Sequence, residues 1–487
     1  MAVQLSTSSF WTNVAVIGPT GNGKSTLAGF LLFAHWFIPP GEMEEADRAA
    51  QTRGDPSLKF AFLFDRKSSE RVSTGSGHGG TQEISWRRLE RPKRRYMLID
   101  TPGHPRRVMY VVGALTDADI ALLVVDPSVC LESRRAGQEA QRTDASATLA
   151  QIATQLALAR FYGITQLIIA LHKMDTHEFL EVDYRKAKAY LGRIVKKLGW
   201  MEDQVHFVPT AVEAVEEKGH NIITDAGPSL SSWYSNGTLV QALEQVQPKP
   251  APGDAPVRMQ ISHVSHGQQG FHWGISGKLF TGIVREQDEL IIQPAGLQFR
   301  VDAIRPIDYT RYLDASHHSQ SSAIAGELVN LSCMVTASGD DEAKLSIGEI
   351  ASAVDFPCQV SSRLKAELVF FSVPTLSKQF LENFSGTFGM GHFHTRFRIK
   401  SFSLDGGGTW QSIENGGRKE RTQKRRLLAK SIRAGKDTPI LVELILDKQA
   451  PLERYVEDVN LGRFVLLDAD HFICGGYITQ VLWIHSY

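Results

Sequence analysis

Cysteine, long apolar runs and a surplus of charge of either sign are all scarce in this chain of 487 residues. Its only cysteines are Cys130, Cys333, Cys358 and Cys474, and no two of them have the short spacing of a metal-binding or disulfide pair. The sequence therefore predicts buried single thiols and gives no reason to expect a zinc site or a disulfide framework. We expect an intracellular protein.

Apolar runs of about 20 residues, the length that a membrane-spanning helix needs, are also missing. The strongly apolar run from Phe30 to Ile38 is much shorter and contains His35. Residues 1–10 have neither a basic region nor a long apolar core, so we expect no signal peptide and no membrane partner. The expected compartment is the cytoplasm, with an organelle left open as the alternative.

The charges balance, because 53 basic residues face 53 acidic ones. A protein that coats nucleic acid usually has a basic surplus, but a neutral total still permits local basic patches. Two such stretches are present, from Arg87 to Arg95 on an expected exposed hairpin and from Arg418 to Arg433 in an expected loop. Each could contact RNA phosphates or could be a solvated charged loop.

In its first half the chain alternates apolar strands with helical patterns. Strands are expected at 13–18, 96–100, 120–126, 167–171 and 205–209, and helices at 148–161 and 184–198. This alternation predicts an α/β domain with a doubly wound, mostly parallel sheet. Ligands of such sheets bind at the carboxyl ends of the strands.

The second half begins with a proline-rich stretch, 247–256, and continues with short strands separated by turn residues. This pattern predicts all-β barrels, with long loops at 311–323 and 406–436. The predicted domains are a nucleotide-binding domain at 1–246, a linker at 247–256, a β-barrel at 257–356 and a second β-barrel at 357–487.

A phosphate-binding loop is predicted where the first strand ends. The residues from Gly18 to Ser25 fit the pattern Gly-x-x-x-x-Gly-Lys-Ser between a strand and a helix. Glycines let backbone amides surround the phosphates, Lys24 adds positive charge at the β and γ phosphates, and the Ser25 hydroxyl can ligate magnesium. The residues expected to contact nucleotide here are Gly18, Thr20, Gly21, Asn22, Gly23, Lys24, Ser25 and Thr26.

Further motifs follow later strands. In Asp100-Thr-Pro-Gly103, the carboxylate can hold magnesium through water, and the Gly103 amide can sense the γ-phosphate. In His172-Lys173-Met174-Asp175, Asp175 would accept hydrogen bonds from guanine N1 and N2, and Lys173 would stack over the base. The third motif includes Thr210 and Ala211, whose backbone could donate to guanine O6. Together these motifs predict a GTP and GDP site.

With these motifs in this order, the sequence resembles the translational GTPases, closest to eukaryotic elongation factor 1-alpha. The resemblance extends to Asp100–His104 and, near the end of the chain, to Leu461–Phe464 and Cys474–Ile478. It implies a GTPase domain followed by two β-barrels, hydrolysis of GTP with Mg²⁺, and a ribosome, tRNA and exchange factor as partners. It also implies that Thr81, 19 positions before Asp100, ligates magnesium with Ser25 and Asp100, and that His104 orients the attacking water.

The chain departs from the family at several points. The first switch, Val72–Thr81, is longer and rich in glycine, His172 replaces the usual Asn, and Cys130–Ser146 is an insertion. We therefore expect nucleotide binding to be retained more securely than turnover. Two alternatives stay open: a nucleotide-binding paralogue with a structural or regulatory role, and the GTPase subunit of sulfate adenylyltransferase, which Trp233-Tyr-Ser also resembles.

Overall fold

The architecture comes from a computed structural model, which describes most of the chain. The described residues are 11–35, 38, 40–64, 81–135, 144–213, 218–222, 227–247, 253–266, 272–307, 320–337, 345–371, 376–434 and 439–482. Internal contacts divide the described residues into two compact units, unit 1 within 11–247 and unit 2 within 253–482. No helix in these described ranges is long and apolar enough to cross a membrane.

A six-stranded sheet forms the centre of unit 1, in the order β2-β3-β1-β4-β5-β6. Its strands are β1 (Trp11–Ile17), β2 (Ser85–Glu90), β3 (Arg95–Asp100), β4 (Ile120–Val125), β5 (Leu167–Leu171) and β6 (Val205–Pro209). All neighbours pair in parallel except β2, which is antiparallel to β3. Every residue of β4 and β5 is buried, as expected of parallel strands covered on both faces. The predicted doubly wound sheet is confirmed.

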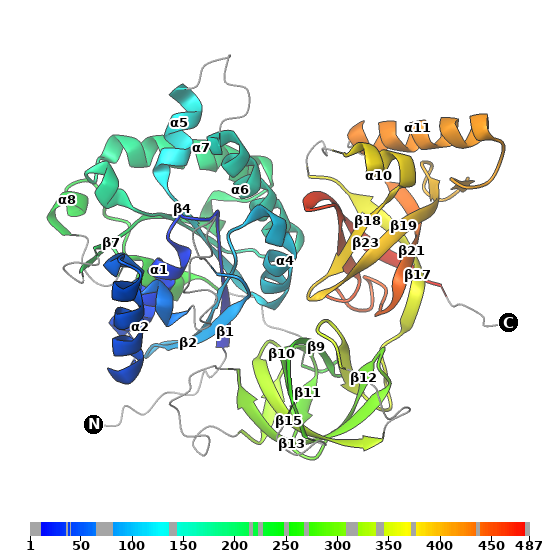
Figure 1. Ribbon diagram of the computed structural model, residues 1–487, viewed down its shortest axis with the longest axis horizontal. Coiled ribbons are helices and arrows are strands. Elements are labelled where there is room, and N and C mark those ends of the chain that lie inside the picture. The colour runs from blue at the N-terminus through cyan, green and yellow to red at the C-terminus, as the bar shows by residue number, and fades with distance from the viewer. Residues whose placement is uncertain are drawn as a thin grey trace. The chain divides into compact units, whose positions relative to one another are not determined.

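Helices surround this sheet, as Figure 1 shows. They are α1 (Lys24–His35), α2 (Pro40–Thr52), α4 (Val108–Asp117), α5 (Pro127–Arg135), α6 (Asp144–Phe161), α7 (Glu181–Lys197), α8 (Gly227–Ser231) and α9 (Leu239–Gln245). A small hairpin of β7 (Ala211–Glu213) and β8 (Lys218–His220) follows β6. Because α1 begins only a few residues after β1 ends, the loop between them lies at the carboxyl edge of the sheet, where the phosphate site was predicted.

The first basic stretch was expected to be exposed, and for its strand residues that expectation is wrong. Arg87 and Arg88 are only 5% and 6% exposed. The Nε atom of Arg87 donates to the carbonyl of Leu63 at 3.0 Å, and its guanidinium also pairs with Glu42 on α2. Since β2 extends the central sheet at its edge, α2 and the segment around Leu63 cover it, and a carboxylate neutralises the buried charge.

Unit 2 begins with a closed barrel in the order β10-β15-β13-β12-β16-β9. Its strands are β9 (Arg258–His266), β10 (His272–Thr281), β12 (Glu289–Gln293), β13 (Leu297–Pro306), β15 (Leu328–Ala337) and β16 (Ile350–Ala353), beside the small pair β11 (Ile283–Arg285) and β14 (Ser322–Ile324). Alternate residues of β13 point inward, and Phe299 and Val301 are fully buried. Of the predicted loop 311–323, residues 311–319 lie outside the described residues. Its last two residues begin β14.

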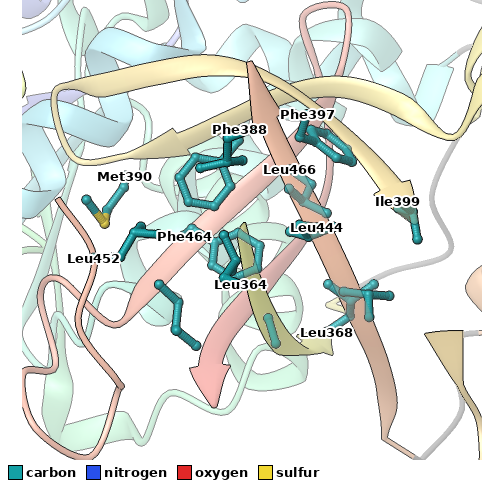
Figure 2. Close-up of a cluster of buried hydrophobic side chains, with 14 of the residues drawn as sticks. Leu364, Leu368, Phe388, Met390, Phe397, Ile399, Leu444, Leu452, Phe464 and Leu466 are labelled. Atoms are coloured by element: carbon teal, nitrogen blue, oxygen red, sulfur yellow. The ribbon is translucent and has the colours of Figure 1, made fainter. Parts of the chain in front are cut away.

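A second barrel closes through β18-β22-β23-β17-β21-β19, with β18 also pairing with β19, and β20 adds to its edge. The strands are β17 (Val360–Val369), β18 (Ser385–Met390), β19 (Phe393–Ser403), β20 (Gln411–Ser412), β21 (Ile440–Pro451), β22 (Arg463–Asp468) and β23 (His471–Val481). Figure 2 shows its core, where Phe388 stacks on Phe464 at 4.8 Å between ring centres and Leu364 and Leu444 fill the neighbouring space. The predicted pair of β-barrels is confirmed, whereas the individual domain limits stay predictions.

The two barrels are joined by specific polar contacts. Gln260 on β9 donates from Nε2 to the carbonyl of Met390 at 3.1 Å, and its Oε1 accepts from the backbone of His392 at 3.1 Å. Arg258, also on β9, pairs with Glu453 at 2.7 Å. Gln260 is 1% exposed, so both ends of its amide are satisfied inside the contact.

The expectation of a long loop at 406–436 is wrong. Most of this segment is α11 (Arg418–Ala434), which lies beside the short helix α10 (Lys378–Asn383). Arg, Lys, Gln, Leu and Ala dominate α11, and all of them are good helix formers. The high charge of the segment concealed a narrow apolar face, formed by Leu428 and Ile432 four positions apart.

Candidate nucleotide site

The loop between β1 and α1 has the backbone that a phosphate cradle requires. Gly18, Gly21 and Gly23 all have positive φ angles, of +142°, +78° and +87°. A Cβ atom on Gly18 would lie 2.3 Å from the carbonyl oxygen of Val124, and one on Gly23 would lie 2.4 Å from the ring of His172. A larger residue at Gly18 would therefore push the loop away from the sheet, and one at Gly23 would push it away from the base motif.

Polar side chains fix this loop from inside. Lys24 is 6% exposed, and its Nζ donates to the carbonyl of Pro19 at 3.0 Å, so the ammonium lies across the loop. Asn22 donates to the carbonyl of Thr20 at 3.2 Å and accepts from the backbone N–H of Asp126 at 2.7 Å. Asn22 thus attaches the loop to the end of β4, and Lys24 is held where a phosphate would meet it.

Three oxygen-bearing side chains meet at the start of α1. The Ser25 hydroxyl donates to Asp100 Oδ2 at 2.5 Å and lies 3.0 Å from Thr81 Oγ1. Asp100 is fully buried, and its Oδ1 has no hydrogen-bond partner among the described residues. Burial raises the pKa of Asp100, against the opposing effects of Lys24 and the Ser25 hydrogen bond. Hydroxyl and carboxylate oxygens with one unused buried acceptor fit the ligand set of Mg²⁺, directly or through water.

The loop after β3 lies directly against the phosphate loop. A Cβ atom on Gly103 would lie 2.6 Å from the backbone nitrogen of Thr20 and 2.5 Å from Lys24 Nζ. The carbonyl of Gly103 accepts a hydrogen bond from Gln151 on α6 at 2.8 Å. The sequence did not predict this contact, which joins residues 48 positions apart. His104 is exposed, and its Nδ1 accepts from the backbone of Arg106 at 3.2 Å.

These segments border a cavity of about 1110 Å³. Its walls contain ten of the residues predicted from sequence: Thr20, Gly21, Gly23, Lys24, Ser25, Thr26, Thr81, Gly103, His104 and Lys173. The remaining predicted residues do not line the cavity: Gly18, Asn22, Asp100, His172, Asp175, Thr210 and Ala211. Sequence patterns missed several further lining residues, among them Arg53, Arg106, Arg107 and Tyr110, which belong to no motif. The cavity is rich in cations, as an anionic ligand requires.

The histidine of the base motif is a structural support. His172 is 3% exposed, and its Nδ1 lies 3.0 Å from the hydroxyl of Thr210. Burial, reinforced by the charge of Lys173, lowers the pKa of His172 to about 4, so the ring is neutral at pH 7. Because the ring also packs on Gly23, one side chain connects the phosphate loop with the end of β6.

The rest of the base motif is held by the phosphate loop and by β4. Lys173 has a left-handed backbone, with φ of 61°, and its Nζ donates to the carbonyl of Gly21 at 2.6 Å. The same ammonium lies 3.4 Å from Asp126, a contact that the sequence did not predict. Asp175 follows on the exposed side, where partial burial and the carboxylate of Glu213 raise its pKa. Thr210 and Ala211 are fully buried at the end of β6.

A phosphate loop, a carboxylate motif after β3 and a base motif after β5, followed by two closed barrels, define a guanine-nucleotide-binding GTPase of the translation-factor type. Residues 10–249 match the model of the elongation factor Tu GTP binding domain. Elongation factor 1-alpha of Methanocaldococcus jannaschii is 30% identical over 365 residues, which cover 74% of this chain and 76% of the relative. Elongation factor 1-alpha of Aeropyrum pernix is 28% identical over 478 residues, 96% of each chain. The chain belongs to the elongation factor 1-alpha family.

Solved structures of other proteins share the predicted fold. The GTPase-like domain of S. cerevisiae Ski7, bound to GTP, aligns with a TM-score of 0.70 at 17% identity and covers 97% of both chains. Translation elongation factor SelB of Methanococcus maripaludis, in complex with the GTP analogue GppNHp, aligns with a TM-score of 0.61 at 16% identity, over 97% of this chain and 80% of that one. At such identities these likenesses confirm the predicted fold alone, and the sequence relatives confirm the predicted family.

Proposed function

We propose that this GTPase uses Mg²⁺ and acts on a ribosome, to which it delivers aminoacyl-tRNA or a protein of tRNA-like shape. The observation that carries the catalytic part is the meeting of Ser25, Thr81 and Asp100 beside Lys24. Its relatives named elongation factor 1-alpha support the ribosomal part. They give no support to the sulfate adenylyltransferase alternative. A translational role also favours the cytoplasm as the compartment.

The residues around the phosphates have complementary roles in this proposal. Ser25 and Thr81 would hold the metal through their hydroxyls, and Asp100 would hold it through a water molecule. When bound, Mg²⁺ neutralises charge that develops on the β and γ phosphates. Lys24 binds the same oxygens, and the Gly103 amide is the γ-phosphate sensor, supported by the contact of its carbonyl with Gln151.

His104 is proposed to orient the attacking water. Its Nδ1 already accepts the backbone N–H of Arg106, which leaves Nε2 as the ring atom available to a water in the cavity. Positioning of a nucleophile by such a group typically contributes about 10²–10⁴-fold to the rate. His104 lies in the cavity wall and is exposed, so a partner can reach it.

The base end is proposed to select guanine. Asp175 would accept the N1 and N2 protons, the stem of Lys173 would cover the base, and the backbone after Thr210 would donate to O6. Adenine lacks the N1 proton and the amine at C2, so it would leave the Asp175 carboxylate without its partners. His172 would support these groups through its contact with Thr210.

The test is GTP turnover by the purified protein, with and without ribosomes of cytosolic and organellar type. We expect stimulation by one class of ribosome and a loss of at least about 100-fold in the stimulated rate for His104→Ala. Lys186→Ala, on the exposed side of α7, is the matched control. Absence of stimulation by every ribosome, with a slow rate that His104→Ala leaves unchanged, would overturn the proposal and favour a nucleotide-binding paralogue with a regulatory role. His172 in the base motif is the feature that keeps this second candidate open.

A further inference from the structure

Helix α11 is attached to the second barrel by one side only. Leu428 and Ile432 are 0% and 1% exposed and belong to the core of that barrel. On the same side, the guanidinium of Arg425 donates to the carbonyl of Glu382 at the end of α10. Figure 1 shows α11 running alongside α10 at the edge of the barrel. The helix is therefore fixed in place, with its opposite side turned away from the core.

That opposite side is a row of cations. Helix α11 contains eight Lys or Arg residues and one Glu, Glu420. At about 100° per residue, four of the cations lie together on the side opposite Leu428 and Ile432. They are Lys419, Arg426, Lys430 and Arg433, here called the α11 stripe, and all four are exposed. With a rise of about 1.5 Å per residue, the stripe extends over roughly 21 Å.

The stripe has no acidic partners within the part of the chain that the structure describes. Glu420 pairs with Lys424, which is not in the stripe. The other basic stretch differs in this respect, because Arg87 is buried against Glu42 and Arg91 pairs with Glu244. Four cations on a helix that is packed on the barrel, with no acidic side-chain partner among the described residues, form a surface for a polyanion.

We infer that the α11 stripe binds the phosphate backbone of double-stranded RNA. Cations along about 21 Å can neutralise several successive phosphates. The counterions that these phosphates held are then released, which favours binding. Helix α11 contains no aromatic residue on which the bases of a single strand could stack. Duplex RNA is recognised mainly through its shape and phosphates, which suits a straight row of charges. The choice of RNA rests on the proposed translational function.

Two other polyanionic surfaces fit the helix less well. A basic amphipathic helix binds an anionic membrane by inserting its apolar face, but the apolar face of α11 is already buried in the barrel. A stable protein interface needs apolar or aromatic anchors at its centre. On the exposed part of α11 the only large apolar side chain is Leu427, which is 39% exposed.

The test measures binding of the full-length GDP-bound protein to a fluorescent 24-base-pair RNA duplex over a range of salt concentrations. The stripe variant combines K419A, R426A, K430A and R433A. Each lost phosphate contact lowers the salt slope by about 0.9, so we expect a decrease of roughly 3.6 and about 10²–10³-fold weaker binding near 0.15 M salt. Alanine favours an exposed helix, so α11 should persist.

The matched control removes four cations from an exposed helix face elsewhere. It combines K186A, R193A, K196A and K197A on α7, with the same change in net charge. We expect it to retain the affinity and salt slope of the wild type. Equal losses in both variants, or no loss in the stripe variant, would overturn the proposal. Preferential loss of binding to phosphatidylserine vesicles, with RNA binding unchanged, would overturn it in favour of a membrane.

A measurement on the wild-type protein covers the case in which the stripe variant misfolds. Lysine acetylation is followed with and without the RNA duplex. RNA should protect Lys419 and Lys430 and leave Lys186 and Lys196 reactive, and equal reactivity with and without RNA would contradict the inference. Because these assays contain neither GTP nor ribosomes, their outcome is separate from that of the turnover test.

Discussion

The phosphate end and the base end of the nucleotide site are built on different principles. At the phosphate end, the structure brings the glycine loop, Lys24 and the Ser25–Asp100 contact together as the phosphate motifs predicted. At the base end, a buried neutral histidine replaces the usual amide, yet it still connects Thr210 with the phosphate loop. Residues that touch phosphate are constrained by charge, whereas residues that support the base loop need only the right shape and hydrogen bonds.

The largest expected effect is at the phosphate end. Lys24→Ala removes a buried cation from the centre of the phosphate loop, and such losses cost about 4 kcal/mol, or about 1000-fold in affinity. Calorimetric titration with GTP and magnesium measures it, with Lys186→Ala as the control. Affinity within tenfold of the wild type would mean that the loop amides alone hold the phosphates, which would remove the distinction between the two ends.

The next largest effect is the pH dependence of the free energy of unfolding that His172 causes. An unfolded histidine titrates near 6.5, whereas the native pKa of His172 is about 4, so the unfolded state binds more protons between these values. His172 therefore destabilises the fold as pH falls from about 6.5 to 4, by roughly 1.4 kcal/mol per unit and about 3 kcal/mol in total.

Denaturant unfolding of wild type and His172→Asn at several pH values isolates this contribution. The difference between the two free energies of unfolding should be constant above pH 7 and should shift against the wild type below pH 6.5. A difference that does not change with pH would show that His172 titrates normally and is not buried as described.

A smaller change is expected for base selection. Asp175→Asn replaces one acceptor oxygen with a donor, which suits the carbonyl at C2 of xanthine and opposes the amine of guanine. Loss of a charge-assisted hydrogen bond costs about 2 kcal/mol, or roughly 30-fold in affinity for GTP. Competition between GTP and xanthosine triphosphate measures the switch, and unchanged preference for GTP would place the base away from Asp175.

The smallest effect tests whether His172 supports GTP binding as well as the usual Asn would. His172→Asn restores the usual amide, and one added polar contact is worth about 0.5–1.5 kcal/mol, up to about tenfold in GTP affinity. We expect tighter binding of both GTP and GDP in titrations at pH 7.5. Weaker binding would show that the packing of the ring on Gly23 contributes more than the amide contact can supply.

Much of unit 1 was predictable because its signals are local. The fully apolar runs of β4 and β5 identify buried parallel strands, and the glycine spacing before Lys24 identifies the loop. The contacts of Gln151 with Gly103 and of Asp126 with Lys173 were not predictable, because they join residues 48 and 47 positions apart and belong to no spacing pattern.

The two basic stretches also differ in a way that their local sequence did not reveal. Their compositions are similar, and sequence alone led to the same pair of interpretations for both. Burial of Arg87 depends on Glu42 and on the backbone of Leu63, which lie 45 and 24 positions away. The good helix formers of Arg418–Ala434 are a local signal for a helix, but which side of it is buried depends on where Leu428 and Ile432 meet the barrel core. The burial of each stretch is set by its tertiary neighbours and is therefore absent from its local pattern.

The glutamine between the barrels has a mechanical consequence. Gln260 is a residue of β9 in the first barrel and holds the turn between β18 and β19 of the second through both ends of its amide. Arg258, two positions earlier on the same strand, holds Glu453. Separation of the two barrels would therefore require these polar contacts to break. A partner bound to either barrel would thus oppose or favour a change in the other one through Gln260 and Arg258.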